Sequence, residues 1–417
     1  MMRFKASLPS YKQIEVELNP GRTVKDLKRL VCEKLGIEPE LTKLLFRGKS
    51  LSENARLAKL KGTEGPVIVD YLWARHLLLW GADGQKTIRS ATVLLAGAGA
   101  IGNEVAKNLA LLGVGRIYIV DRDNVEFSNI SRMIFFEPTD LRKNKAEVLA
   151  KNIHRKFPYV ETIAYRGDLE RMPLKLYLDS DVIICGLDNV VSRIYLSQIC
   201  RKYSIPMVDG GITGLNARVH VYIPPDDACP ICIFPPNQYS QIVGLRNPCD
   251  APLEQDAVPS FATSISLVSS IASQEIIKLV LGLKQYKERG RWPEYSGQPL
   301  RSVLFMDMKN NRFTPMNLKR GEKCFVCGKE GTARDIVPRA EISISSVRDP
   351  KGAERAIRDA AKVSDASLRV FAETSFGEKA LQPLSKIQRG LKQGDYLRVL
   401  GEAKNGELRE SILKVVS

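Results

Sequence analysis

The sequence predicts an α/β protein whose largest domain is built on a mostly parallel sheet, with a small α+β domain on either side. Three observations support this class. Between residues 92 and 210, short apolar runs alternate with helix-length periodic segments, a pattern typical of βαβ units. A glycine-rich turn, from Gly97 to Gly102, separates the first apolar run from the first helical segment. Near both ends of the chain, apolar and polar residues instead alternate as in antiparallel strands.

The composition of the 417 residues is that of a globular chain, long enough for about two to four domains. No apolar run approaches the length of a membrane span, and the N-terminus lacks the apolar core of a signal peptide, so we expect a cytoplasmic protein. The formal net charge is +16, but the basic residues are spread along the chain and form no nucleic-acid motif. This distribution favours an acidic protein partner, or a generally basic proteome, over nucleic acid.

Residues 91–145 carry the main nucleotide signal. An expected strand at residues 93–96, the glycine turn, a helix over residues 103–112 and a second strand at residues 117–120 form one βαβ unit. The glycines let the backbone approach a phosphate, and the N-terminus of the helix presents free N–H groups. Asp121 ends the second strand, where a carboxylate can accept hydrogen bonds from ribose hydroxyls.

Polar and charged residues continue beyond this strand end. They include Arg122, Asp123, Asn129, Arg132 and Lys145. A hydride-transfer enzyme needs a binding site for a second nucleotide in this region, beyond the strand that ends at Asp121. Cationic groups beside nucleotide phosphates instead suit phosphoryl or adenylyl chemistry, because they stabilise developing negative charge.

A second polar strand end follows later in the chain. Residues 182–185 are apolar and lead to Asp188 and Asn189, which indicates a central parallel strand with its active end at Asp188. Ligands bind outside the carboxyl ends of such strands, so Asp188 is well placed to hold Mg²⁺ on a triphosphate. Capping of the helix that begins near residue 190 is the alternative role for this carboxylate.

Four of the eight cysteines form two pairs with CxxC spacing, Cys229 with Cys232 and Cys324 with Cys327. In a cytosolic chain, two such pairs predict a tetrahedral thiolate site for Zn²⁺ rather than disulfides. The alternative is two unrelated pairs. Because four cysteines fill a tetrahedral set, we expect His220 to lie in the core. The chain has only three histidines, which argues against histidine acid–base catalysis.

Residues 1–70 are expected to form a separate small domain. The sequence predicts a hairpin over residues 3–18, a helix over residues 24–35 that Thr23 can cap, and strands at residues 44–46 and 67–69. This ββαββ order, with the stretch FRGKSL, resembles ubiquitin. No Gly-Gly terminus follows, so we expect a fused docking or regulatory module rather than a substrate. An unrelated β-grasp-like cap is the alternative.

The run GAGAIG…LGVG-IYIVDRDNVEFSNISR…K resembles the adenylating domain of ubiquitin-like-protein activating enzymes. Bacterial relatives of these enzymes adenylate the sulfur-carrier proteins of molybdopterin and thiamin biosynthesis. The resemblance extends over about residues 75–317 and departs at Met133, where many relatives carry glutamine. It implies a Rossmann-like adenylating domain over residues 71–330.

The resemblance assigns ATP and Mg²⁺ binding to one set of residues: Gly97, Gly99, Gly102, Asp121, Asp123, Asn129, Arg132, Lys145 and Asp188. It also assigns a role to Arg75, which would reach the ATP phosphates of the partner subunit's site across a two-fold interface. A homodimer is therefore implied, because one chain holds only one complete site. A solvated helix arginine is the alternative for Arg75.

The loop at residues 233–263 contains Cys249, which belongs to neither cysteine pair. Arg246 nearby favours the thiolate, the form that attacks. Related activating enzymes carry their thioester nucleophile in a matching loop, so the resemblance implies this role for Cys249. The alternatives are a spare loop cysteine, or a persulfide or disulfide partner as in sulfur-carrier relatives. The remaining cysteines are expected to be structural: Cys32, Cys185 and Cys200.

These expectations combine into one function. The chain would adenylate the C-terminal glycine of a ubiquitin-like protein ending in Gly-Gly, using ATP and Mg²⁺, and then form a thioester on Cys249. Residues 340–417 would form a ubiquitin-fold domain that recruits a conjugating enzyme, or a generic α+β tail. The main alternative function is an adenylyltransferase for a sulfur-carrier protein, with a thiocarboxylate product. A non-catalytic nucleotide-binding scaffold is the third, and the complete set of phosphate and metal groups argues against it.

Overall fold

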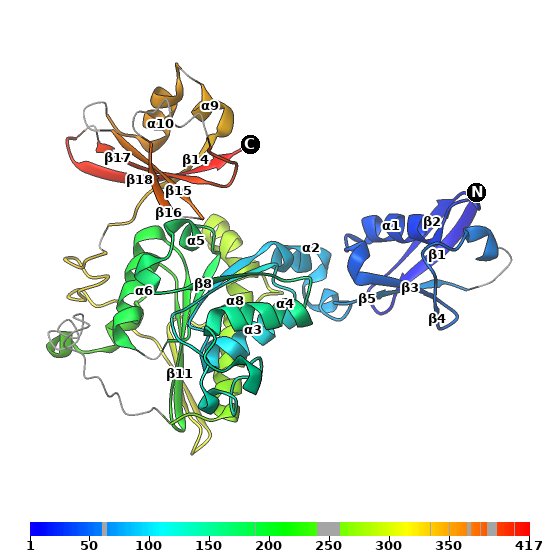
Figure 1. Cartoon of the computed structure of the whole chain (residues 1–417), viewed down its shortest axis with the longest axis horizontal. Helices are drawn as coiled ribbons and strands as arrows, with labels where there is room; N and C mark the ends of the chain where they lie inside the picture. Colours follow the sequence, from blue (N-terminus) through cyan, green and yellow to red (C-terminus); the bar gives the residue numbers. More distant parts are fainter. Residues whose placement is uncertain are drawn as a thin grey trace. The chain divides into compact units, whose positions relative to one another are not determined.

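The computed structural model describes residues 1–60, 65–187, 189–239, 259–333, 335–349, 351–364, 368–375, 377–381, 390–403 and 405–417. The chain forms two compact units, and each is described by itself. Unit 1 contains residues 1–91, 112–115 and 280–298, and unit 2 contains residues 92–111, 116–279 and 299–417. Figure 1 shows the elements along the chain.

The N-terminal domain has the ubiquitin-like β-grasp fold that the sequence predicts. Its sheet has the order β2-β1-β5-β3-β4, with β1 parallel to β5 and antiparallel to β2. Thr23 caps helix α1 at its N-terminus, and Gly36 ends the helix at a φ of 69°, a backbone conformation that favours glycine. The elements are β1 (Met2–Leu8), β2 (Lys12–Leu18), α1 (Val24–Leu35), β3 (Thr42–Phe46), β4 (Lys49–Ser50) and β5 (Val67–Tyr71).

The segment after β5 is packed and does not form a free tail. The Tyr71 hydroxyl donates to a carboxylate oxygen of Glu38 at 2.7 Å. Arg89, from helix α2 (Leu77–Ser90), pairs with the same carboxylate at 3.3 Å and stacks over the Trp73 ring at 5.2 Å. Trp73 is buried, and it packs so closely on Gly113 that a Cβ there would lie 2.4 Å from the ring. These contacts hold the end of the β-grasp domain against α2.

The core of unit 2 is an eight-stranded sheet with the order β13-β12-β11-β10-β9-β6-β7-β8. The five strands from β10 to β8 in this order are parallel to one another, and the pairs β10-β11, β11-β12 and β12-β13 are antiparallel. The mostly parallel sheet is therefore confirmed. Its strands are β6 (Thr92–Ala96), β7 (Arg116–Asp121), β8 (Glu161–Arg166), β9 (Val182–Cys185), β10 (Met207–Thr213), β11 (Asn216–Tyr222), β12 (Val303–Asp307) and β13 (Arg312–Met316).

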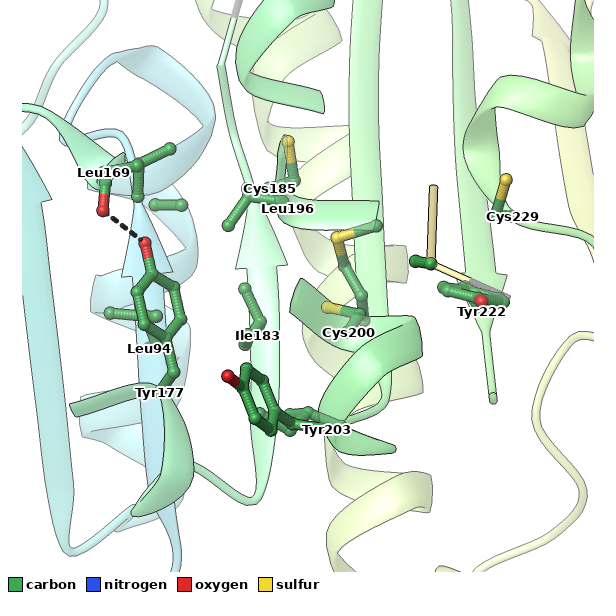
Figure 2. Close-up of a cluster of buried hydrophobic side chains, with 14 of the residues drawn as sticks. Leu94, Leu169, Tyr177, Ile183, Cys185, Leu196, Cys200, Tyr203, Tyr222 and Cys229 are labelled. Carbon is green, nitrogen blue, oxygen red and sulfur yellow. Dashed lines mark hydrogen bonds between the residues drawn. The ribbon is translucent and has the colours of Figure 1, made fainter. Parts of the chain in front are cut away.

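Helices cover both faces of this sheet. Helices α5 (Leu174–Leu178) and α6 (Val190–Tyr203) pack on one face, where Tyr177 and Cys200 meet Ile183 of β9 (Figure 2). Helices α3 (Ala100–Leu112) and α8 (Ala262–Arg289) lie on the other face, and a Cβ on Gly210 would meet side chains of both. Helix α4 (Lys145–Lys156) packs against β7 and β8.

The sequence predicts a mostly apolar helix over residues 263–282 that ends on Gly282, and helix α8 differs from this prediction. It continues beyond Gly282 to Arg289, although the glycine predicted its end. The glycine serves packing instead, because a Cβ on Gly282 would lie 2.6 Å from the Trp292 ring. By length and composition α8 could also cross a membrane, with a mean hydropathy of 1.4 over its most apolar window, but 61% of that window is buried. Buried core helices pass the same test, so this is weak support for a membrane span.

The C-terminal part of unit 2 is a second α+β arrangement. Its five strands have the order β14-β18-β17-β15-β16, with β14 parallel to β18. This order does not repeat that of the N-terminal domain, and the ubiquitin-fold assignment of residues 340–417 stays a prediction. The elements are β14 (Arg339–Ser343), α9 (Ile344–Arg348), α10 (Ala353–Ala361), β15 (Arg369–Thr374), β16 (Gly377–Ala380), β17 (Tyr396–Glu402) and β18 (Leu408–Val416).

Candidate functional site

The glycine turn connects β6 to α3, and its glycines have different physical roles. Gly97 has a φ of 96°, which an L-residue with a side chain rarely adopts. A Cβ on Gly102 would lie 1.9 Å from the carbonyl oxygen of Gly97, so only glycine fits there. Apart from Gly99 itself and its two chain neighbours, no described residue has an atom within 4 Å of the position that a Cβ on Gly99 would take. The side of Gly99 on which a Cβ would lie is therefore open, next to the N-terminus of α3.

Asp121 faces this turn from the end of β7. One carboxylate oxygen accepts a hydrogen bond from the N–H of Ala98 at 2.7 Å, and the other accepts from the N–H of Asp123 at 2.8 Å. Burial raises the pKa of Asp121, while these two N–H groups act in the opposite direction. Each oxygen keeps acceptor capacity for a hydroxyl group. The carboxylate that is predicted to hold a ribose therefore also holds the glycine turn in place.

Asn144 joins the predicted residues beyond β7 into one network. Its amide donates to the carbonyl oxygens of Asp121 at 3.0 Å and Asp123 at 3.1 Å. Its side-chain oxygen caps α4 by accepting from the N–H of Glu147. Lys145 follows and places its ammonium 3.3 Å from the Asp123 carboxylate, with 12% of its side chain exposed. Our interpretation of the sequence missed Asn144, although asparagine directly before a helix is a typical cap.

Asn129 and Arg132 share the turn that follows. Asn129 is buried, and its side-chain oxygen accepts from the N–H of Glu126 at 3.0 Å. The guanidinium of Arg132 donates to the carbonyl oxygen of Ser128 at 2.6 Å. The backbone N–H of Arg132 donates to the carbonyl oxygen of Asn129. Met133, where the resemblance departs, is buried as a core residue. The turn thus has apolar packing at Met133 and cationic character at Arg132.

This turn is held against α3 and α4 by a two-sided clamp on Phe135. The buried side chain of Asn103 accepts from the Phe135 N–H at 3.1 Å, and Asn152 donates to the Phe135 carbonyl oxygen at 2.8 Å. Asn103 lies in the first turn of α3, and Asn152 lies in α4. The clamp therefore fixes the segment that carries Arg132 relative to the glycine turn.

The second predicted strand end lies at β9. Asp188 itself lies outside the described residues, so its predicted Mg²⁺ role stays a prediction. The neighbouring Asn189 caps α6, and its side-chain oxygen accepts from the N–H of Ser192 at 2.8 Å. Helix capping is thus provided by Asn189.

A buried charge cluster lies beside this strand end, and the sequence did not point to it. Asp209 of β10 is fully buried and accepts from the guanidinium of Arg193 at 2.8 Å and from that of Arg218 at 3.2 Å. Burial alone would raise the pKa of Asp209, but the two guanidiniums outweigh it and lower the pKa. Register places Asp209 opposite Cys185, the last residue of β9. The cluster therefore fixes α6 to the sheet beside that strand end.

The two cysteine pairs come together in the structure. The sulfur of Cys229 lies 3.8 Å from that of Cys232 and 3.7 Å from that of Cys324, and Cys232 lies 3.4 Å from Cys327. Around an ion bound to sulfur at about 2.3 Å, tetrahedral ligands lie about 3.8 Å apart, so the four sulfurs fit a tetrahedral ion such as Zn²⁺. Burial raises the pKa of Cys229, and a bound metal would replace its proton.

His220 lies outside this cysteine cluster, in the core, as predicted. It is buried, and one ring nitrogen pairs with the carbonyl oxygen of Ala228 at 2.9 Å. Burial lowers its pKa to about 4. The three cysteines that were expected to be structural are also buried, and burial raises the pKa of each: Cys32, Cys185 and Cys200.

The structure does not test the roles predicted for two further residues. Cys249 lies outside the described residues. Arg75 lies in unit 1, in the turn between β5 and α2, and its side chain is exposed. Its predicted role requires a second subunit, so both assignments stay predictions.

The strand ends, the open glycine turn and the nearby cations have the arrangement of a nucleotide-binding α/β domain. Comparison with known families makes this specific: the chain belongs to the ThiF family, whose model matches residues 73–326. It is therefore an enzyme of the ATP-dependent adenylyltransferase class. The Ubiquitin family model matches residues 4–72, in agreement with the β-grasp domain.

Three relatives illustrate the range of similar proteins. A sulfur carrier protein adenylyltransferase of Thermus thermophilus is 28% identical over 270 residues, which are 62% of this chain and 89% of the relative. The adenylyltransferase and sulfurtransferase MOCS3 of Caenorhabditis briggsae is 26% identical, over 62% of this chain and 60% of the relative. The NEDD8-activating enzyme E1 catalytic subunit of Saccharomyces cerevisiae is 36% identical, over 34% of this chain and 50% of the relative. The chain thus spans most of the first relative and only part of the other two.

Proposed function

We propose that the chain uses ATP to adenylate the C-terminal carboxylate of a separate β-grasp carrier protein of the sulfur-carrier class. The observation that carries this proposal is the network of Asp121, Asn144 and Lys145 at the end of β7. The network brings together a carboxylate that can accept hydrogen bonds from ribose hydroxyls and a cation that can bind a phosphate, and the proposed chemistry requires both groups. The sulfur carrier is preferred because the relative of that name is matched over 89% of its length. This preference reverses the order of the two enzyme hypotheses drawn from the sequence.

The reaction needs positioning and charge stabilisation rather than proton abstraction, because the carrier carboxylate is ionised at neutral pH. One carboxylate oxygen attacks the α-phosphorus and forms an acyl-adenylate. The bond from the α-phosphorus to the oxygen bridging to the β-phosphorus breaks, and pyrophosphate leaves. Lys145, Arg132 and the partner subunit's Arg75 stabilise the negative charge on the phosphates.

The expected ions have separate roles. Asp188 would hold Mg²⁺, since carboxylate oxygens are its preferred protein ligands, and the ion would offset charge on the departing pyrophosphate. The cysteine cluster would hold Zn²⁺ in a structural role, since four thiolates leave no open coordination position.

The test is ATP–pyrophosphate exchange with two kinds of Gly-Gly-ended carrier, a sulfur carrier and a ubiquitin-like modifier. We expect exchange with the sulfur carrier, and a loss of about 100-fold in Lys145→Ala, because one transition-state cation is removed. Lys143→Ala is the matched control, since Lys143 lies two residues earlier, is exposed and pairs with Asp140. The proposal would be contradicted if the wild-type protein showed exchange with neither of the two carriers.

A second candidate function is thioester formation on Cys249. The 36% identity to an activating-enzyme catalytic subunit supports it, as does the additional C-terminal domain. A non-reducing gel of the reaction with either carrier separates the candidates. A thiol-sensitive adduct that is lost in Cys249→Ala would favour the activating enzyme, whereas exchange without an adduct favours sulfur-carrier chemistry.

A further inference from the structure

Arg201 of α6 is a buried guanidinium whose partners carry no formal charge. The residue is 4% exposed. One N–H donates to the carbonyl oxygen of Ala333 at 3.3 Å, and another donates to that of Pro225. Among the described residues, no carboxylate pairs with it. A buried cation without a counter-charge is costly, so an anionic group is expected close by.

Both carbonyl partners belong to the loops that carry the cysteine pairs. Pro225 lies between the end of β11 and Cys229. Ala333 donates its N–H to the carbonyl oxygen of Val326 at 3.0 Å, and Val326 lies between Cys324 and Cys327. The C-terminal end of α6 is therefore tied, through one guanidinium, to both halves of the cysteine cluster.

Tyr222 supplies a second unmatched group in the same place. Its side chain is fully buried, and within the described parts of the chain its hydroxyl has no hydrogen-bond partner. Tyr222 packs in the same hydrophobic cluster as Cys229 and Cys327, and Figure 2 shows it beside Cys229. A buried hydroxyl without an acceptor is unfavourable, and a thiolate is an acceptor that such a donor can use.

A divalent ion bound by four thiolates would supply the missing anion, because the four negative charges of the thiolates exceed the two positive charges of the ion. We propose that Arg201 is the counter-charge, and Tyr222 a hydrogen-bond donor, of a metal held by Cys229, Cys232, Cys324 and Cys327. The N–H of Gly321, which lies 3.4 Å from the Cys232 sulfur, is a further donor to the cluster. Metal binding then fixes the C-terminal end of α6, whose N-terminal cap, Asn189, follows the end of β9.

The experiment measures metal retention in the full-length zinc-loaded protein, without ATP or carrier, so that its result is independent of the proposed function. The readouts are zinc content and the rate of zinc transfer to a chromophoric chelator. We expect Arg201→Met to release zinc about 10-fold faster or more, because outer-sphere partners typically change metal affinity by about 10–100-fold. Arg201→Lys, which keeps the charge, should fall between Arg201→Met and the wild type, and Tyr222→Phe should release zinc several-fold faster.

Tyr177→Phe is the matched control. Tyr177 is an equally buried tyrosine of the same hydrophobic cluster, and its hydroxyl donates to the carbonyl oxygen of Leu169 at 2.8 Å (Figure 2). It should release zinc at the wild-type rate. Cobalt substitution adds a spectroscopic readout, since the thiolate-to-cobalt charge-transfer band should shift in Arg201→Met and remain unchanged in Tyr177→Phe.

The proposal is overturned if folded Arg201→Met and Tyr222→Phe release zinc at the wild-type rate. It is also overturned if the wild-type protein binds neither zinc nor cobalt through its cysteines. Should Arg201→Met fail to fold, Tyr222→Phe decides alone, because it removes only one oxygen atom.

Discussion

The carboxylate of Asp121 accepts a hydrogen bond from the backbone N–H of Ala98 at 2.7 Å. The end of β7 thereby holds the turn that follows β6. The predicted ribose contact and the shape of the turn therefore involve the same side chain, so the two can be tested together.

Asp121→Asn should weaken the binding of a non-hydrolysable ATP analogue by about 10–100-fold, because a hydrogen bond to a charged group contributes about 1.5–3 kcal/mol. Titration calorimetry measures this change. Asp168→Asn is the control, since Asp168 forms an exposed ion pair with Arg122 at 3.3 Å. Unchanged affinity in Asp121→Asn would contradict the predicted ribose contact.

Two glycines of the same turn should respond in opposite ways to alanine. Gly102→Ala places a Cβ 1.9 Å from the Gly97 carbonyl oxygen, and such overpacking costs at least about 1–3 kcal/mol. Gly99→Ala meets no described atom within 4 Å, so it should fold normally and bind the ATP analogue more weakly. Thermal unfolding and calorimetry of both variants check this. Equal stability of the two variants would contradict the described turn.

The clamp on Phe135 predicts that a substitution away from the proposed phosphate-binding residues also affects stability and exchange. Asn152→Ala leaves the buried carbonyl oxygen of Phe135 without its donor, which should cost about 1–3 kcal/mol of stability. It should also lower the rate of pyrophosphate exchange, since the segment with Arg132 loosens. Asn108→Ala is the control, because Asn108 bonds the Ser273 hydroxyl instead. If exchange in Asn152→Ala matches the control, the clamp does not position Arg132.

His220 predicts a pH dependence of stability. Burial lowers its folded-state pKa to about 4, below its ordinary value of 6.5. The unfolded chain therefore binds the proton first, and stability falls as the pH drops from 6.5 toward 4. A shift of this size corresponds to about 3 kcal/mol at the acid end. Thermal unfolding from pH 7 to 4 should show a shallower decline in His220→Gln than in the wild type.

His154→Gln is the control for this titration, because His154 is exposed in α4. It should follow the wild-type decline. An identical slope for His220→Gln and the wild type would show that another buried group dominates the acid sensitivity.

Local patterns predicted much of the fold. The glycine turn, the apolar runs and the cap at Thr23 each depend on residues close in sequence, and the structure agrees with them. The two cysteine pairs also come together, as predicted. The CxxC spacing makes this prediction possible, because each pair already supplies two of the four ligands of one site. The end predicted for α8 at Gly282 was wrong, because the packing of Trp292 overrides the local preference of glycine.

The sequence by itself determined which residue types were available at each strand end and in what order the small and large domains follow. Only the tertiary structure decided which of these groups share one network. Asn144 bonds Asp121 and Asp123 because α4 begins beside the end of β7. Asp209, Arg193 and Arg218 come from a helix and two strands, and no local pattern relates them. Burial of these charges requires partners, and folding of distant segments brings those partners together.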